Sequence, residues 1–196
     1  MASGSEQAGG RPGEQAIRIG AICGSLRVQS TNQLLLQAFA KAAPAPVHID
    51  TSLSLALLPL FNPDLERATP DSVSDLAERI DVCDGLLIAS PEYAHGMTGV
   101  LKNALDWLVS RSEIPGKPVM LVHASARSDT SREHLREVLR TMSCHVYGGE
   151  EFVFHLIGKA PGEAAMLLDA DDMRATMRET LMRFAAFVRG GGREAG

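Results

Sequence analysis

Apolar residues in this chain fall into two alternating patterns. Short runs that are apolar throughout predict buried strands, and longer stretches with apolar residues three and four positions apart predict amphipathic helices. The short runs predict strands at residues 17–24, 47–50, 85–89, 118–124 and 151–154. Helical spacing is found at residues 34–42, 73–80, 100–108, 135–142 and 173–188.

Strands that are apolar throughout and alternate with helices indicate a parallel sheet that is covered by helices on both faces. Five such strands predict an α/β fold of the flavodoxin-like type, a three-layer doubly wound sandwich with a five-stranded parallel sheet. We expect one domain over residues 16–189, because two domains cut from 196 residues would each struggle to bury a core. Residues 1–15 are small and polar and residues 190–196 are rich in glycine, so we expect a disordered and a flexible tail there.

The composition argues against several classes of protein. A net charge of −5, with 45% hydrophobic and 22% charged residues, fits a globular chain and not a nucleic-acid-binding one. The first residues lack the apolar segment of a secretory signal, and the apolar stretch at residues 53–60 is too short to span a membrane. Cys23, Cys83 and Cys144 form no C-x-x-C pair, which fits reduced thiols and a cytoplasmic location.

The loop after the first strand has the composition of an anion site. Ser25, Ser30, Thr31 and Asn32 offer donors beside a helix N-terminus, where free N–H groups favour a phosphate, and Arg27 can neutralise its charge. The loop is not a P-loop, because no Gly-Lys-Ser/Thr follows, and it is not the dinucleotide G-x-G-x-x-G. The alternative is that Ser30 or Thr31 only caps the helix, which would leave the rest of the cluster unexplained.

The loop after the third strand is rich in polar and aromatic groups. It contains Pro91, Glu92, Tyr93, Ala94, His95 and Gly96, whereas an ordinary connection needs only turn formers. Loops after the central strands of a doubly wound sheet meet at one edge, so we expect this loop beside the first one and beside Ala124 and Ser125 of the next. A phosphate on the first loop would place an attached flat heterocycle against the second and third loops.

These loops contain no pairing of a nucleophile with a base and no metal-ligand spacing. We therefore expect no catalytic side chain and no metal, and we expect a cofactor to supply any reactivity. His95 is either a proton source or a hydrogen-bonded fixture. His123 lies in a strand pattern and is expected to be a core or interface residue, while Trp107 is expected to be a packing or dimer anchor.

Two motifs make the chain resemble a known family. The segment Gly24-Ser25-Leu26-Arg27-x-x-Ser30-x-Asn32 is followed by Pro91-Glu92-Tyr93 and by Gly99-x-Leu101-Lys102-Asn103-Ala104-x-Asp106-Trp107. Together they are similar to the NAD(P)H-dependent FMN reductase family, which includes quinone, chromate and azo-dye reductases, over residues 17–154. The resemblance implies a flavodoxin-like fold, bound FMN, NADPH or NADH as cosubstrate, a small-molecule electron acceptor, and a homodimer or a dimer of dimers.

The resemblance also implies roles for single residues. The FMN phosphate would be held by Ser25, Arg27, Ser30 and Asn32 with Thr31 beside them, and the isoalloxazine would be lined by Pro91, Glu92, Tyr93, Ala94, His95 and Gly96. Family members often have Asn where this chain has Ala94, so one polar contact is lost or made by the backbone. They often have a Gly-rich third loop where this chain has residues 124–129, and Arg111 and Arg127 are candidates for a nucleotide 2′-phosphate.

Three hypotheses follow for the function. The first is an FMN-dependent oxidoreductase that takes hydride from NAD(P)H and passes it to an acceptor such as a quinone, free flavin, azo dye or metal oxyanion. The second is a flavodoxin-like carrier of single electrons to a protein partner. The third is a flavin-binding sensor or scaffold without turnover.

Overall fold

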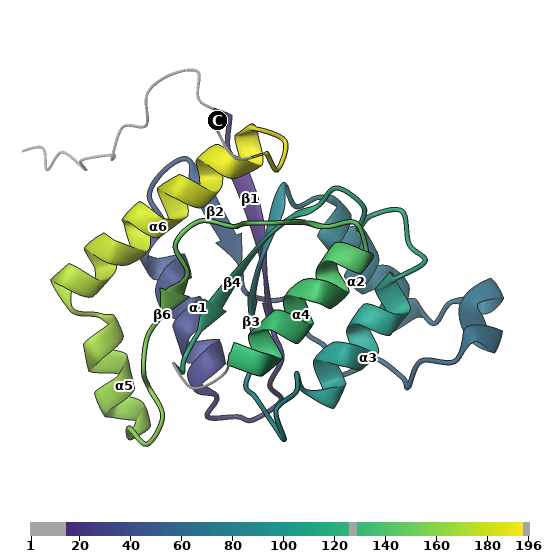
Figure 1. The fold of residues 1–196 in the computed structure, drawn as a ribbon, viewed down its shortest axis with the longest axis horizontal. Helices are drawn as coiled ribbons and strands as arrows, with labels where there is room; N and C mark the ends of the chain where they lie inside the picture. Colours follow the sequence, from purple (N-terminus) through teal and green to yellow (C-terminus); the bar gives the residue numbers. More distant parts are fainter. Residues whose placement is uncertain (1–14, 126–128, 194–196) are drawn as a thin grey trace, which may run out of the picture.

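The computed structural model describes residues 15–125 and 129–193, which form a parallel sheet covered by helices (Figure 1). The strands follow the order β2-β1-β3-β4-β5, and β6 also pairs with β4. Their bounds are β1 Ile17–Cys23, β2 Val47–Asp50, β3 Gly85–Ala89, β4 Pro118–His123, β5 His145–Val146 and β6 Phe152–Val153. The helices are α1 Thr31–Ala42, η1 Pro63–Ala68 (a 3₁₀-helix), α2 Asp71–Asp81, α3 Gly99–Leu108, α4 Asp129–Thr141, α5 Pro161–Leu168 and α6 Asp171–Arg189.

This order confirms the predicted flavodoxin-like, doubly wound fold, with one difference in the fifth strand. The sequence predicts a single strand at residues 151–154, but two short strands share that edge of β4. The first, β5, pairs with Pro118 and Val119, and the second, β6, pairs with Val122 and His123. Gly148 and Gly149 lie between them, and without side chains they give the strand no surface to pack.

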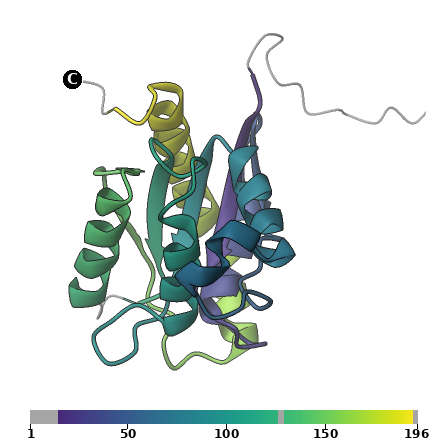
Figure 2. The ribbon, with the colours of Figure 1, turned by 90° about the vertical axis from the view of Figure 1, so that its right-hand side faces the viewer.

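Side chains of the central strands alternate between two hydrophobic clusters. In β3, Leu87 and Ala89 join the cluster under α1, α5 and α6, whereas Leu86 and Ile88 join the cluster under α2, α3 and α4. In Figure 2 the helices α2, α3 and α4 accordingly lie in front of the strands and α6 lies behind them. Burial on both faces explains why these strands are apolar throughout.

The predicted helices form where the apolar spacing places them. In α2, Val73, Leu76, Ala77 and Ile80 are at most 4% exposed. Helix α5 is absent from the prediction, and the spacing explains why: only Ala164 and Leu168 are buried in it, so it has no repeated apolar stripe.

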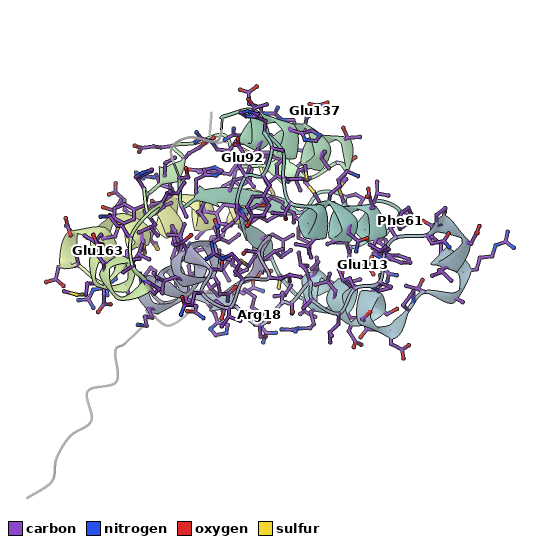
Figure 3. All side chains as sticks on the ribbon, turned by 90° about the horizontal axis from the view of Figure 1, so that it is seen from below. Arg18, Phe61, Glu92, Glu113, Glu137 and Glu163 are labelled. Atoms are coloured by element: carbon purple, nitrogen blue, oxygen red, sulfur yellow. The ribbon has the colours of Figure 1, made fainter. Side chains whose placement is uncertain are left out.

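The segment between β2 and α2 makes a long excursion that ends in η1. Asn103 and Trp107 of α3 hold it, because the Asn103 side-chain amide and the Trp107 indole N–H both donate to the Pro59 carbonyl, at 2.9 and 2.8 Å. The Phe61 N–H donates to Asn103 Oδ1 at 2.8 Å. Figure 3 shows Phe61 and Glu113 at one end of the molecule and Glu163 of α5 at the other. Trp107 is therefore a packing anchor within this chain.

Two further predictions concern the ends of the chain and membranes. Residues 1–14 and 194–196 lie outside the described residues, so the expected tails stay predictions. Among the helices of the described part, none is long and apolar enough to cross a membrane.

Candidate functional site

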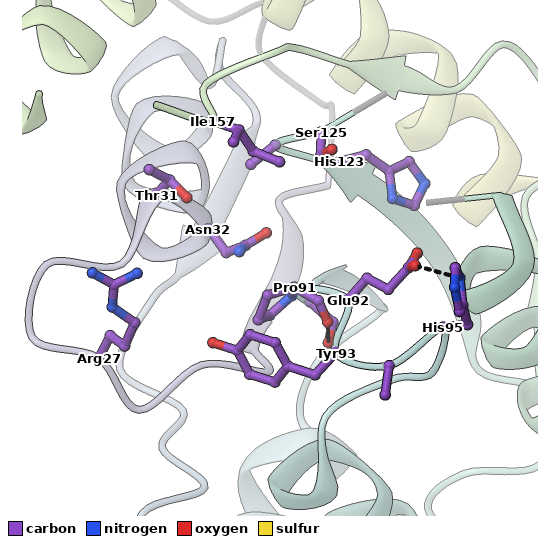
Figure 4. Close-up of a pocket in the computed structure, with 13 residues that line it drawn as sticks. Arg27, Thr31, Asn32, Pro91, Glu92, Tyr93, His95, His123, Ser125 and Ile157 are labelled. Carbon is purple, nitrogen blue, oxygen red and sulfur yellow. Dashed lines mark hydrogen bonds and ion pairs between the residues drawn. The ribbon is translucent and has the colours of Figure 1, made fainter. Parts of the chain in front are cut away.

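A cavity of about 410 Å³ opens at the carboxyl ends of β1, β3 and β4 (Figure 4). This is the edge where the chain reverses its direction across the sheet, since β2 lies on one side of β1 and β3 on the other. Three loops line it, together with the start of α1, the last residue of β4 and one residue of the segment after β6: Arg27, Thr31, Asn32, Ser90, Pro91, Glu92, Tyr93, Ala94, His95, His123, Ala124, Ser125 and Ile157. The predicted meeting of the loops is therefore found.

The first loop brings positive charge and helix N–H groups to one side of this cavity. The Ser30 hydroxyl accepts a hydrogen bond from the Gln33 N–H at 3.3 Å and so caps the N-terminus of α1. For this hydroxyl, the alternative that it only caps the helix is the one observed. Thr31 and Asn32 follow in the first turn, where a helix has no carbonyl partners for its own N–H groups. The Arg27 side chain lies on the same side of the cavity (Figure 4). A helix N-terminus and one cation on the same side of a cavity are groups that can bind an anion.

The first and second loops are in direct contact. A side chain on Gly24 would come within 2.5 Å of the Ser90 hydroxyl, so only glycine fits there. The buried Thr98 hydroxyl donates to the Gly24 carbonyl at 2.7 Å and accepts from the Leu101 N–H at 3.2 Å, which caps α3. Thr98 thus joins the end of the second loop to the start of the first.

The second loop contains a tight turn in an unusual conformation. Tyr93 and Gly96 exchange two backbone hydrogen bonds of 3.0 Å, which leaves Ala94 and His95 as the two central residues. Both have positive φ, 50° for Ala94 and 60° for His95, as a type I′ turn requires. Neither is a glycine, and side chains with a Cβ are disfavoured in this region by about 1–2 kcal/mol each.

The turn places His95 beside the carboxylate of Glu92. His95 Nδ1 lies 3.2 Å from Glu92 Oε1, and the Glu92 side chain is 17% exposed against 85% for His95. Figure 4 shows the Glu92 side chain reaching from the loop toward His95. The other oxygen, Oε2, is buried and has no hydrogen-bond partner in the described part of the chain.

His123 ends β4 and faces the same cavity. It is 6% exposed, and its Nε2 lies 3.4 Å from Glu151 Oε2 but outside hydrogen-bonding geometry. Arg132 and Arg136 of α4 both pair with Glu151. Burial, assisted by the charges of Arg132 and Arg136, lowers the pKa of His123 to about 3, so the imidazole is neutral at neutral pH.

Three buried side-chain atoms lack a hydrogen-bond partner within the described residues, and all three belong to residues that line this cavity. They are Asn32 Oδ1, Glu92 Oε2 and His123 Nε2. Buried polar groups are normally hydrogen-bonded, and an unpaired one costs about 1–3 kcal/mol. Three of them in one cavity indicate a ligand that brings its own hydrogen-bonding groups.

Most of the predicted site residues line the cavity, with three exceptions. Ser25 does not line it, and its hydroxyl accepts from the Arg27 N–H at 3.4 Å. Ser30 lines a second hollow of about 710 Å³ that shares Arg27 and Thr31 with the first. Gly96 closes the turn through its backbone.

The structure also brings in residues that the sequence reasoning did not assign to the site. Ser90 and Ile157 line the cavity, and His123, expected in the core or at an interface, lines it as well. Ile157 follows a segment whose backbone runs along the end of β4, with Phe154 N–H on the His123 carbonyl at 2.8 Å. No local motif marks Ile157. Position could have revealed His123, because it is the last residue of a central strand.

Other candidates fall elsewhere. Arg111 pairs with Glu113 at 2.8 Å and lines a separate cavity, and Arg127 lies outside the described residues, as do the rest of the third loop at 126–128. The described residues contain no group of three side chains that could hold a metal ion. Burial raises the pKa of Cys23, and the Ser30 hydroxyl lies 3.9 Å from its sulfur, so this thiol is not an activated nucleophile.

Comparison with known proteins gives consistent results. The family model described as NADPH-dependent FMN reductase matches residues 17–159. A quinone reductase of Escherichia coli (strain K12) is 34% identical over 146 residues, which cover 71% of this chain and 78% of that protein. An NAD(P)H-dependent FMN reductase of Pseudomonas aeruginosa is 35% identical over 179 residues, which cover 88% of this chain and 96% of that one.

A solved structure shares the fold. The flavoenzyme NAD(P)H:(acceptor) oxidoreductase from Paracoccus denitrificans superposes with a TM-score of 0.75 over 90% of this chain and 99% of that one, at 23% identity.

Proposed function

The chain belongs to the NADPH-dependent FMN reductase family, and on that basis we propose that it binds FMN in the cavity described above, takes hydride from NADPH or NADH, and passes the electrons to a small acceptor. The relatives named above include a quinone reductase and an FMN reductase, so quinones and free flavins are the acceptors to test first. Azo dyes and metal oxyanions are the next candidates.

The residues present fit this cofactor from end to end. A phosphate monoester is matched by Arg27 and by the free N–H groups at the start of α1. A chain of hydroxyl groups attached to it would offer donors to the unpaired Asn32 Oδ1. A flat heterocycle at the far side would meet Pro91, the loop backbone and the unpaired atoms of Glu92 and His123.

FMN, when bound, supplies the hydride and electron chemistry. The chain's own residues bind and orient it. Tyr93 is 58% exposed at the mouth of the cavity, where its ring can cover an aromatic ligand. His123 is neutral, so it can exchange hydrogen bonds with a ligand but brings no positive charge to it.

The proposal extends to partners and location. Leu57 and Leu60 are 82% and 85% exposed on the excursion between β2 and α2, which is the apolar surface that a homodimer or a dimer of dimers would cover. Light scattering after gel filtration tests this assembly. The three cysteines are free and buried, which supports a cytoplasmic location.

The observation that carries the proposal is that one cavity, beside a helix N-terminus and an arginine, is lined by three residues with a buried polar atom that has no partner among the described residues. The test is the absorption spectrum of the purified protein, followed by oxidation of NADPH and of NADH with a quinone present. We expect a flavin spectrum and FMN-dependent turnover. Colourless protein that also ignores added FMN would contradict the proposal.

A further inference from the structure

We propose that the Glu92 carboxylate accepts the hydrogen bond of the ring N–H of oxidised FMN, and that His95 is the positioning residue that aims the carboxylate at it. The inference deepens the proposed function and rests on it, because it takes FMN as the ligand.

The two oxygens of Glu92 have different surroundings. Oε1 lies 3.2 Å from Nδ1 of the exposed His95 side chain, while Oε2 is buried and has no partner in the described residues. Glu92 is one of the residues that line the cavity. The contact between Oε1 and His95 therefore restrains the rotation of the carboxylate, and Oε2 stays available to a ligand. An acceptor in this situation needs a donor, because an unpaired buried charge is costly.

None of the described residues, the neutral His123 included, is hydrogen-bonded to Oε2. Arg27 is the cation among the described lining residues, and Figure 4 shows it on the opposite side of the hollow from Glu92. His95 is already engaged with Oε1. Arg132 and Arg136 pair with Glu151. Oε2 is therefore available to accept a hydrogen bond from a bound molecule.

Oxidised FMN has one donor to offer at this position. Its ring carries a single N–H, at N3, and the other polar ring atoms are acceptors, while the hydroxyl groups belong to the chain that leads to the phosphate. With the phosphate on the Arg27 side, the ring lies on the Glu92 side, so N3–H is the group that Oε2 can receive. A carboxylate acceptor makes this bond stronger than a neutral one would be.

The backbone explains how His95 does its part. His95, with φ 60°, and Ala94, with φ 50°, are the central residues of a two-residue turn, and the imidazole lies beside the Glu92 carboxylate (Figure 4). His95 itself is 85% exposed, so its effect on the ligand has to pass through Glu92. Asn is the residue that best combines a side-chain donor with tolerance of positive φ.

The test is a fluorescence titration of the flavin-free protein with FMN and with 3-methyl-FMN, which lacks the N3 donor. We expect the wild type to bind FMN about 10- to 100-fold more tightly than 3-methyl-FMN, the range for a hydrogen bond to a charged group. Glu92→Ala should bind the two within about threefold of each other, and Glu92→Gln, which keeps an acceptor oxygen, should lie between.

His95 is tested by the same ratio. His95→Ala should lower the preference for FMN, and His95→Asn should restore it, because the asparagine amide can donate to Glu92 Oε1 from a residue that tolerates positive φ. Glu113→Ala is the matched control: its side chain is 15% exposed, close to that of Glu92, but it pairs with Arg111 and lies apart from Glu92 in Figure 3. It should leave the preference unchanged.

The outcomes separate the two claims. A wild type that binds both flavins equally, or a Glu92→Ala variant that keeps the wild-type ratio, would overturn this inference and leave the proposed function standing. Equal ratios for His95→Ala and the wild type would overturn the positioning role. A wild type that binds no FMN at all would overturn the proposed function and this inference with it.

Discussion

Replacing Thr98 with Val removes one hydrogen bond between the second loop and the first, together with the side-chain cap of α3, and changes little else. The hydroxyl donates to the Gly24 carbonyl at 2.7 Å, across 74 positions of sequence, and accepts from the Leu101 N–H at 3.2 Å. Val has nearly the same shape, so packing is retained, while the buried carbonyl and the first turn of α3 both lose a partner.

The magnitude follows from these two losses. Losing an N-cap costs about 1 kcal/mol and an unsatisfied buried carbonyl about 1–3 kcal/mol, so the free energy of unfolding should fall by about 2–4 kcal/mol. For a chain of this size each kcal/mol lowers the melting temperature by about 2–4 °C. Urea unfolding of the flavin-free protein, followed by circular dichroism, measures the change directly.

Two control variants make the result interpretable. Thr98→Ser keeps the hydroxyl and should lose less than about 1 kcal/mol. Thr141→Val removes an exposed hydroxyl that donates to the Glu137 carbonyl within α4, and it should have an effect of about 0.5 kcal/mol or less. If Thr98→Val and Thr98→Ser were equally stable, the role given to this hydroxyl would be refuted.

Three further predictions concern charge and backbone conformation. Arg27→Ala should weaken FMN binding by about 1.5–3 kcal/mol and leave riboflavin, which has no phosphate, unaffected in parallel titrations; equal losses for both would remove Arg27 from the phosphate site. The pKa of His123 is lowered to about 3 in the folded chain. Between about pH 3 and pH 6.5 the imidazole is therefore protonated in the unfolded chain and neutral in the folded chain. The free energy of unfolding should therefore be fully retained above about pH 6.5 and fall toward pH 3, and His123→Gln should flatten this fall in urea titrations; an unchanged pH dependence would contradict the burial of a neutral imidazole. Ala94→Gly should raise the free energy of unfolding by about 0.5–1 kcal/mol, because glycine adopts positive φ without a steric penalty. Ala186→Gly, in an exposed turn of α6, is the control and should lower the free energy of unfolding by about 1 kcal/mol. If both variants were less stable than the wild type, the backbone at Ala94 would not be strained.

The sheet and the location of the site could be predicted from the sequence, because both depend on the apolar pattern. A strand buried on both faces has to be apolar at every position, and Leu86 to Ala89 show this directly. Once the strands are known, the rule that loops after the central strands meet at the carboxyl edge predicts that the loops after β1, β3 and β4 lie together. Arg27 lies near the start of α1 because it is part of the short loop that leads into this helix.

The details that depend on tertiary contacts could not be predicted. The split of the last strand depends on which part of β4 each half can reach, and Ile157 enters the cavity only because the chain after β6 runs along the end of β4. The use of Trp107 within its own chain depends on the excursion that brings Pro59 to it. The sequence pattern predicts that His123 is a core or interface residue. Only the structure shows that its Nε2 is buried without a hydrogen-bond partner among the described residues and that the residue lines the cavity.

Anaerobic mixing of the FMN-loaded protein with NADPH or NADH in a stopped-flow spectrometer shows whether the bound flavin takes hydride from a nicotinamide nucleotide. We expect the flavin absorbance to be bleached on mixing with at least one of the two nucleotides and to return when a quinone is added. An FMN-loaded protein that neither nucleotide reduces, while a chemical reductant does, would contradict it and would favour a carrier of single electrons.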